Sequence, residues 1–596
     1  MYKIASAQFG YRFGEQLYYP YSIAVLAAYL NNSQFEFLPC AVDRTMVYAY
    51  AEQYANADIL LLSCYNWSWE ISKVLAAEFK RRNASILVIA GGAQIPAAKI
   101  TVPNIDVLVY GEGELSLKNI LDGYSKGEET PPQVWGADCM LIDLNDALSP
   151  YTSGIMHRLV DQNAAKWVAT FETTRGCPHG CDYCAWGEAS HSKVRQYPLT
   201  RIYDEIDWFA KNQVGYIECA DANFGMLERD VLIAEYLAMT KRAYGYPRVF
   251  KPSWSKKITA RVYRIAATLK DAGLLLSAGC SLQSLNPDAL KKNHRVSVGF
   301  DEFKTIVDTF RKSGAQTFTE LIRGLPGETL DSFKWGLNQV VFESNVDTVY
   351  IYNCTALENT QLKARGYPTV HSPLYFAHAS PDPIAEYEDL LIASETFTQA
   401  DLERMYLYSW YMLAFQHLGI LNYITQYLKQ EHDVPYELFW QRFQAYCQAN
   451  TDSLFGREYW NASRYIADGY AGRGWTGVYP LDEATWLRVT QDQTELQQAM
   501  RELVAEDLID IVEDLIRFQL FTLSHEDNPP VIIQQFDFDW KRYFTTGRLE
   551  QRAVTFAWDN KITQFTDSDD WNKQAIWYGR RKITYKVRLE DIREQI

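Results

Sequence analysis

Short apolar runs alternate with helical patterns over the first 122 residues of the chain. Residues 57–65 and 85–92 read ADILLLSCY and SILVIAGG, and such continuous apolar runs are typical of strands buried on both faces of a parallel sheet. Between them, residues 72–82 have the apolar spacing of a helix. We therefore predict an open, doubly wound, Rossmann-like α/β domain over residues 1–125.

Three loops follow the predicted strands of this front domain. They read SCYNWSWE at 63–70, GGAQIP at 91–96 and YGEGE at 110–114. Open α/β sheets bind their ligands at the carboxyl ends of the strands. We therefore expect the ligand of the front domain at these three loops.

The periodicity is lost over residues 126–165, which collect Gly, Pro, Ser and Asp and are predicted to form a linker. A second βα series then begins. Six strands with helices between them predict a partial parallel (β/α)6 barrel over residues 166–375, with its functional residues on the loops after the strands. The predicted strands cover residues 166–173, 215–223, 248–255, 274–282, 317–324 and 348–354.

The last third of the chain, residues 376–596, is predicted to be mainly helical with some β structure. We expect this part to cap the barrel and to shape a substrate pocket. The helical patterns lie at 382–397, 402–418 and 437–447, and β-rich aromatic stretches follow at 531–540 and 582–590.

The composition is that of a globular protein with two or three domains. Of 596 residues, 47% are hydrophobic and 22% are charged, and single cores stop growing at roughly 250–300 residues.

No apolar run approaches the roughly 18 residues of a membrane span, and the start MYKIASAQFG has no secretory signal, so we expect a cytoplasmic protein. The net charge of −16 argues against nucleic acid as the main ligand, because phosphate binding needs clustered Lys and Arg.

Three of the ten cysteines lie close together, in TTRGCPHGCDYCAWG after the first predicted barrel strand. Cys177, Cys181 and Cys184 have the spacing C-x3-C-x2-C. A loop with three thiolates can ligate three irons of a [4Fe–4S] cubane and leave the fourth iron open. The alternatives are a structural zinc site, because His179 could complete a set of four ligands, and three unrelated buried cysteines. The other cysteines are scattered and are expected to be mostly buried thiols.

Together with Tyr183, these cysteines match the C-x3-C-x-aromatic-C signature, and the chain resembles the radical S-adenosylmethionine (SAM) enzymes. The run RGCPHGCDYCAWG is similar to the cobalamin-dependent branch, especially to enzymes that methylate unactivated carbons in ribosomal peptides and other natural products. The resemblance covers about residues 1–360. It implies a [4Fe–4S] cluster on the three cysteines, SAM as a cofactor, and cobalamin in the front domain.

By the same resemblance, the loops after the barrel strands would contact SAM. Asp221 and Asn223 end the second strand, where the family turns its backbone towards the SAM amino group. Ordinary turns and polar strand ends are the alternative explanation for each candidate. The further candidates are Ser255, Lys257 and Gln283 near the SAM carboxylate and ribose, and Glu320 and Gly324 near the adenine.

The three loops of the front domain correspond to those that cover the corrin and its nucleotide tail in this branch. The D-x-H-x-x-G signature that supplies a histidine to cobalt is absent, and the first histidine is His157. We expect Trp67 to lie beneath the corrin and to exclude water and the dimethylbenzimidazole base; a Trp that only packs the sheet against the barrel is the alternative. The candidate contacts are Ser63, Tyr65, Trp67, Gly91, Gly92, Gln94, Glu112 and Gly113.

The resemblance implies a C-methyltransferase that uses methylcobalamin and a 5′-deoxyadenosyl radical to methylate an unactivated sp3 carbon of a peptide or other natural product. One SAM would supply the methyl group and a second SAM would yield the radical. A flavodoxin- or ferredoxin-type electron donor is implied as a partner. The alternatives are a ring-forming or rearranging enzyme with the same cofactors but no methyl transfer, and a non-enzymatic cobalamin-binding sensor or carrier.

Overall fold

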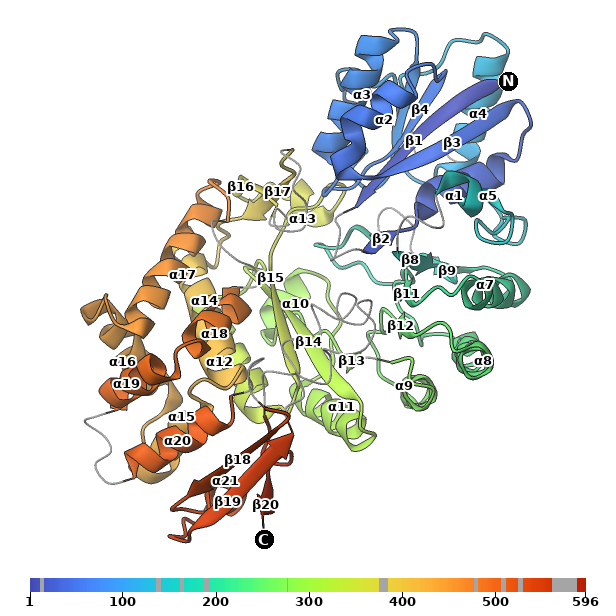
Figure 1. Ribbon diagram of the computed structural model, residues 1–596. Coiled ribbons are helices and arrows are strands. Elements are labelled where there is room, and N and C mark those ends of the chain that lie inside the picture. The colour runs from blue at the N-terminus through green and yellow to red at the C-terminus, as the bar shows by residue number, and fades with distance from the viewer. Residues whose placement is uncertain are drawn as a thin grey trace. The chain divides into compact units, whose positions relative to one another are not determined.

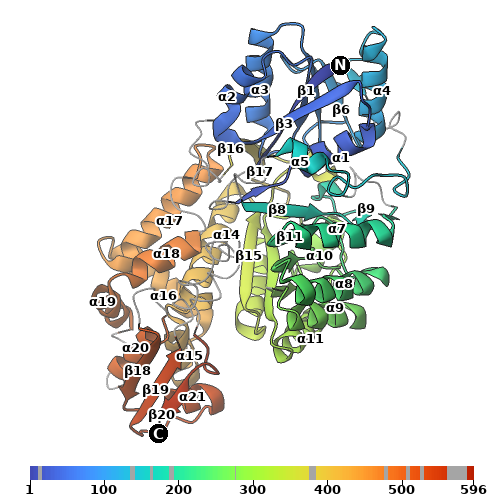
Figure 2. The same cartoon turned by 45° about the vertical axis from the view of Figure 1, so that its right-hand side comes forward.

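The computed structural model divides into two compact units (Figures 1 and 2). The first comprises residues 1–329 and 350–398, and the second comprises residues 330–349 and 399–596. The structure describes residues 1–10, 16–134, 141–160, 166–186, 193–275, 277–374, 384–475, 481–504, 511–523, 529–559 and 587–595.

A parallel six-stranded sheet forms the front part of the first unit, in the order β3-β1-β4-β5-β6-β7. The chain adds β3 on one side of β1 and all later strands on the other, which is a doubly wound order. The predicted fold class is therefore confirmed. The strands are β1 (Tyr2–Gly10), β3 (Phe35–Asp43), β4 (Ile59–Ser63), β5 (Leu87–Gly91), β6 (Val107–Val109) and β7 (Gln133–Val134).

Helices cover both faces of this sheet, with α2 and α3 on one side (Figure 1). The β4 side chains alternate between the two sides: Ile59 and Leu61 join one apolar cluster, and Leu60 and Leu62 join the other. A strand buried on both faces needs apolar residues at every position, which explains the continuous run ILLLS. The helices are α1 (Tyr21–Leu30), the short 3-10 turn η1 (Arg44–Met46), α2 (Val47–Gln53), α3 (Trp69–Arg82), α4 (Glu114–Ser125) and α5 (Ile155–Leu159).

Two parallel sheets, β12-β11-β8-β2 and β13-β14-β15, form the partial barrel. The Phe250 N–H donates to the Leu274 carbonyl at 2.9 Å, which joins the two sheets. All six predicted strands are present, and β2 (Gln16–Tyr18) from the front of the chain pairs with β8 as well. The strands are β8 (Lys166–Phe171), β11 (Tyr216–Cys219), β12 (Val249–Lys251), β13 (Ser277–Gly279), β14 (Gln316–Arg323) and β15 (Thr348–Asn353).

Helices follow the barrel strands, and a hairpin follows β15. The two strands β9 (Thr174–Arg175) and β10 (Arg195–Gln196) pair across the cysteine-containing segment. The remaining elements of the first unit are α7 (Leu199–Lys211), α8 (Arg229–Tyr244), α9 (Ala260–Asp271), α10 (Pro287–Lys292), α11 (Phe300–Lys312), α13 (Gln361–Ala364), β16 (Thr369–Pro373) and β17 (Tyr387–Leu391).

The second unit is mainly helical, as predicted, and its β structure is a three-stranded antiparallel sheet, β18-β19-β20. The helix predicted at 382–397 is wrong, because Tyr387–Leu391 form β17, which pairs with β16 in the first unit. The predicted β stretch 582–590 lies outside the described residues up to 586, and residues 587–590 contain no strand. Its elements are α12 (Leu330–Asn338), η2 (Gln339–Glu343), α14 (Gln399–Tyr411), η4 (Met412–His417), α15 (Asn422–His432), α16 (Tyr436–Ala449), α17 (Leu454–Tyr470), α18 (Leu481–Thr490), α19 (Gln493–Val504), α20 (Val512–Phe521), β18 (Val531–Phe536), α21 (Trp540–Thr546), β19 (Val554–Asp559) and β20 (Arg593–Gln595).

The aromatic residues of the second unit are largely packing residues. Trp410, Trp440 and Trp486 are fully buried between its helices, and Trp440 stacks on Tyr411 with ring centroids 5.0 Å apart. Much of the aromatic surplus of the chain is therefore explained by burial. None of the described helices combines the length and the apolarity needed to cross a bilayer.

Candidate functional site

The three-cysteine loop follows β8 at the carboxyl edge of the barrel. Cys177 and Cys181 are buried and Cys184 is partly exposed. The buried Asp221 carboxylate, after β11, accepts hydrogen bonds from the backbone N–H groups of Thr173 at 2.7 Å and Thr174 at 2.9 Å. Asp221 therefore holds the strand end from which the cysteine loop departs.

Two polar groups donate hydrogen bonds to the cysteine sulfurs. The Asn223 Nδ2 lies 3.3 Å from the Cys177 Sγ, and the Lys256 Nζ lies 3.2 Å from the Cys181 Sγ. Donors of this kind stabilise sulfur in its anionic form, which is the form that binds metal. The Asn223 Oδ1 is buried and has no partner among the described residues, so it offers an acceptor to a ligand beside the cluster.

Three thiolates on one loop are the donor set of a cubane with one open iron. In the described stretches, no three His, Cys, Asp or Glu side chains converge where one metal ion could be held. In a cubane each thiolate binds a different iron, so the sulfurs need not converge. The donor set and its hydrogen bonds therefore fit a [4Fe–4S] cluster.

The other SAM candidates lie around this loop on neighbouring strand ends. Ser255 is buried, and its N–H donates to the Phe224 carbonyl, whereas Lys257 is exposed. Gln283 has a φ of +66°, and its N–H donates to the Glu320 carbonyl at 2.8 Å. Gly324 has a φ of +81° after β14, a conformation that favours glycine. Contact of these residues with SAM stays a prediction.

A cavity of about 720 Å³ opens at the carboxyl edge of the front sheet. This volume is within the range of roughly 300–1,000 Å³ that is usual for ligand sites. The cavity lies where β1 and β4 meet, the point at which the strand order reverses. Seven of the eight predicted cobalamin residues line it: Ser63, Tyr65, Trp67, Gly91, Gly92, Glu112 and Gly113.

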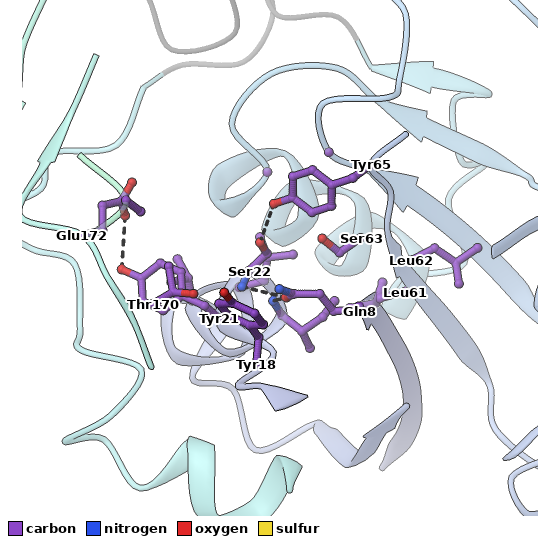
Figure 3. Close-up of a pocket in the computed structure, with 18 of the residues that line it drawn as sticks. Gln8, Tyr18, Tyr21, Ser22, Leu61, Leu62, Ser63, Tyr65, Thr170 and Glu172 are labelled. Atoms are coloured by element: carbon purple, nitrogen blue, oxygen red, sulfur yellow. Dashed lines mark hydrogen bonds between the residues drawn. The ribbon is translucent and has the colours of Figure 1, made fainter. Parts of the chain in front are cut away.

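Residues of the barrel line the same cavity. Figure 3 shows Ser63 and Tyr65 of the front domain on one side and Thr170 and Glu172 on the other. Glu218 on β11 also reaches the cavity and accepts a hydrogen bond from the Tyr18 hydroxyl at 2.5 Å. A ligand in this cavity would therefore contact both the front sheet and the barrel strands.

An aromatic pair forms part of the cavity wall. The Tyr65 and Trp67 rings stack with centroids 4.5 Å apart and planes 4° apart. The Tyr65 hydroxyl lies 3.1 Å from the Ser22 Oγ (dashed in Figure 3), and Trp67 remains 38% exposed. A flat, partly exposed aromatic surface suits a flat ligand such as a corrin.

Gln94 is the one predicted cobalamin residue that does not line the large cavity. Its backbone N–H donates to the Cys64 carbonyl at 3.1 Å. Its side chain lines a separate cavity of about 60 Å³, beside Asn66 and Glu386. The structure therefore gives Gln94 a place in the loop but not in the wall of the large cavity.

Three residues outside the front sheet hold its loops, and none of them was identified from the sequence. The Arg175 guanidinium pairs with Glu112 and Glu114 of the YGEGE loop and with Glu172. The Asn359 side chain binds the Ala97 N–H at 2.7 Å and the Ile95 carbonyl at 2.8 Å. The Glu386 carboxylate accepts from the N–H groups of Glu70, the last residue of the SCYNWSWE loop, and of Ile71 after it.

Some of the missed residues had a partial signal in the sequence. Lys256 is next to the predicted residue Lys257, and Arg175 lies two residues before the first cysteine of the motif. Gln8 and Ser22 line the cavity at the end of β1 and the start of α1, and the rule that ligands bind at strand ends points to them. Asn359 and Glu386 carry no local signal, because their partners lie far away along the chain.

Two families match this chain. Residues 171–336 match the Radical SAM superfamily, and residues 14–121 match the B12 binding domain. The first match begins at the end of β8 and includes the cysteine loop. The second includes all three loops around the large cavity.

Two proteins similar to this chain extend over most of its length. A 2-(S-pantetheinyl)-carbapenam-3-carboxylate methyltransferase of Streptantibioticus cattleyicolor is 30% identical over 84% of this chain and 81% of its own. The cobalamin-dependent radical SAM methyltransferase TokK of Streptomyces tokunonensis is 29% identical over 86% of this chain and 83% of its own. Both alignments are long enough to include much of the second unit.

A solved structure has the same fold at low sequence identity. It is the radical SAM methyltransferase TsrM from Kitasatospora setae, with tryptophan and a SAM analogue bound. Its TM-score is 0.54 at 14% identity, over 70% of this chain and 90% of TsrM. This likeness concerns the fold.

Replacement of Gly92 by Ala tests the packing of two cavity loops. Gly92 has a φ of +110°, and an added Cβ would lie 2.5 Å from the Cys64 carbonyl oxygen. We expect Gly92→Ala to lower the free energy of unfolding by about 2–4 kcal/mol and to weaken cobalamin binding at least tenfold, as measured by melting and by titration. Gly91→Ala is the control for stability, because its Cβ would meet only ordinary contacts at 3.6 Å. Equal free energies of unfolding in both variants would contradict this packing.

The buried Asp221 predicts a pH-dependent stability. Burial raises the pKa of Asp221 from 3.8 to about 7, so the folded state binds a proton that the unfolded state releases. The stability gained from this group is complete below about pH 4 and is lost as the pH rises to about 7, on the order of 4 kcal/mol in total.

Asp221→Asn mimics the protonated form and should abolish this pH dependence. Melting temperatures of both proteins would be measured without cofactors from about pH 5 to about pH 8. We expect the wild type to lose stability relative to Asp221→Asn as the pH rises. A wild type that gains stability relative to the variant over this window would refute the raised pKa.

Proposed function

The chain belongs to the cobalamin-dependent radical SAM methyltransferases, and on this premise we propose that it methylates an unactivated sp3 carbon of a natural-product scaffold. Its cofactors are a [4Fe–4S] cluster, SAM and cobalamin. The observation that carries the proposal is the cavity, which is lined both by the carboxyl edge of the front sheet and by the barrel strands. A group bound in this cavity would lie beside residues of the front sheet and of the barrel strands together.

The residues of the chain hold and orient these groups. Cys177, Cys181 and Cys184 hold the cluster, and Asn223 and Lys256 donate to two of the sulfurs. The Asn223 Oδ1, buried without a partner, can accept from the SAM amino group. When bound, cobalamin supplies the methyl group, and the cluster with SAM supplies the 5′-deoxyadenosyl radical.

Trp67 is proposed to lie under the corrin. No histidine precedes His157, so the front domain has no imidazole for cobalt. The Trp67 ring, stacked on Tyr65 and partly exposed to the cavity, is a bulky apolar surface that would keep water and nitrogen bases away from the metal.

A small carbapenam-like acid is the substrate class that we favour over a peptide. The cysteine-loop and β14 motifs suggested a peptide. However, the relative that acts on 2-(S-pantetheinyl)-carbapenam-3-carboxylate is similar over both units, including the part expected to shape the substrate pocket. An electron donor of the flavodoxin or ferredoxin type completes the system, because the cluster must be reduced before SAM is cleaved.

The cysteine loop can be tested without any substrate. The triple variant Cys177→Ala, Cys181→Ala, Cys184→Ala should lose the [4Fe–4S] absorption and its roughly four irons per chain, measured after anaerobic reconstitution. Cys354→Ala is the control, since this thiol is buried outside the loop and its loss should leave the iron content unchanged. A complete cluster in the triple variant would overturn the assignment of these ligands.

Product stoichiometry tests the reaction. Each methylation should consume two SAM and yield one S-adenosylhomocysteine and one 5′-deoxyadenosine, because SAM has two separate roles. The assay would offer a pantetheinylated carbapenam carboxylate and, in parallel, peptides encoded near the gene. Turnover with 5′-deoxyadenosine but no added methyl group would favour the ring-forming alternative. Methylation of peptides alone would contradict the substrate class.

A further inference from the structure

A fully buried ion pair joins the front domain to the segment after the barrel. The Arg44 Nη1 lies 2.8 Å from the Glu386 Oε1, and the two side chains are 1% and 0% exposed. Arg44 is in the short turn before α2, and Glu386 immediately precedes β17. The two residues are thus 342 positions apart in the chain.

Arg44 of this pair also binds the backbone of Trp67. The Arg44 guanidinium donates to the Trp67 carbonyl at 2.9 Å and to the Ile384 carbonyl at 2.8 Å. The planar guanidinium can serve these acceptors and the Glu386 carboxylate at the same time. Arg44 therefore ties the Trp67 backbone to the segment that carries Glu386.

Glu386 also caps the helix that follows the loop. Its carboxylate accepts from the N–H groups of Glu70 at 2.7 Å and Ile71 at 3.1 Å, in the first turn of α3. The N-cap residue of α3, Ser68, makes no side-chain capping bond, and its hydroxyl accepts from the Tyr65 N–H instead. The Glu386 carboxylate, from a distant segment, thus takes the place of a local N-cap side chain. Its negative charge also interacts favourably with the helix N-terminus.

Trp67 needs such support because its own packing is incomplete. Its ring is 38% exposed and stacks on one face against Tyr65. A buried ion pair is seldom the most stable way to fill an interior, since apolar residues of similar size often do as well. A geometric role, in which the pair fixes the loop between Tyr65 and α3, accounts for its presence.

We propose that Arg44 and Glu386 are positioning residues that set the place of Trp67 against the lower face of the corrin. This inference rests on the proposed function, in which cobalamin occupies the large cavity with Trp67 beneath it. Through this pair, the segment after the barrel controls which groups can approach cobalt from below. The axial environment of the metal then depends on two residues that do not touch it.

The test is electron paramagnetic resonance of cob(II)alamin bound to the holoenzyme. The main variant is Arg44→Met with Glu386→Met, which removes both charges and leaves no buried charge unpaired. Trp67→Ala gives the reference spectrum for cob(II)alamin without the Trp67 ring beneath the corrin. Arg201→Met with Glu205→Met is the matched control, a buried ion pair that lies within α7.

We expect the Arg44/Glu386 double variant to bind cobalamin and to keep the wild-type cluster spectrum. Its cob(II)alamin spectrum should shift towards that of Trp67→Ala, and its kcat should fall at least tenfold with the KM for SAM unchanged. The Arg201/Glu205 control should keep the wild-type cob(II)alamin spectrum. Arg44→Lys, which keeps the charge but loses the planar fork, should give an intermediate shift.

Two results would overturn the inference and are distinguishable. If Trp67→Ala changes the cob(II)alamin spectrum and the Arg44/Glu386 variant does not, the positioning role is wrong while the proposed function stands. If Trp67→Ala leaves the spectrum of bound cob(II)alamin unchanged, Trp67 is not at the lower face. The proposed place of Trp67 and the inference then fail together.

Discussion

The site depends on polar contacts that hold the loops of the front sheet against residues of the barrel and of the segment after it. Arg175 binds the YGEGE loop, Asn359 binds the GGAQIP loop, and Glu386 with Arg44 binds the loop of Trp67. A doubly wound sheet leaves its carboxyl edge open for a ligand, so the strands themselves do not hold the loops at that edge in place. Arg44 of the front domain and the contacts from outside the front sheet supply that support.

Arg175 connects the cysteine loop with a loop of the large cavity. Arg175 stands two residues before Cys177 and pairs with Glu112 and Glu114 of the front domain, so the cluster loop and a loop of the large cavity share one charged network. Asp221 holds the start of the same cysteine loop. An enzyme that generates a radical at one cofactor and delivers a methyl group from another needs this kind of fixed geometry.

The sequence predicted the features that repeat locally or that carry a chemical motif. The run ILLLS revealed a strand buried on both faces, and the three cysteines revealed the cluster loop. Gly91 and Gly92 were singled out because glycine allows close backbone contact with a ligand. They line the large cavity, and their contact with cobalamin stays a prediction. Lys256 was missed in favour of its neighbour Lys257, since spacing alone does not say which side chain turns inward. The Arg44–Glu386 pair could not be found, because periodicity carries no information about residues 342 positions apart.

In the proposed reaction, both cofactors act on the same carbon of the substrate. The most direct measurement uses substrate deuterated at the carbon that is methylated, together with SAM that carries a trideuterated methyl group, followed by mass spectrometry of both products. We expect deuterium in 5′-deoxyadenosine and three deuterium atoms in the new methyl group of the product. A methylated product that forms while 5′-deoxyadenosine stays free of deuterium would contradict the proposed reaction.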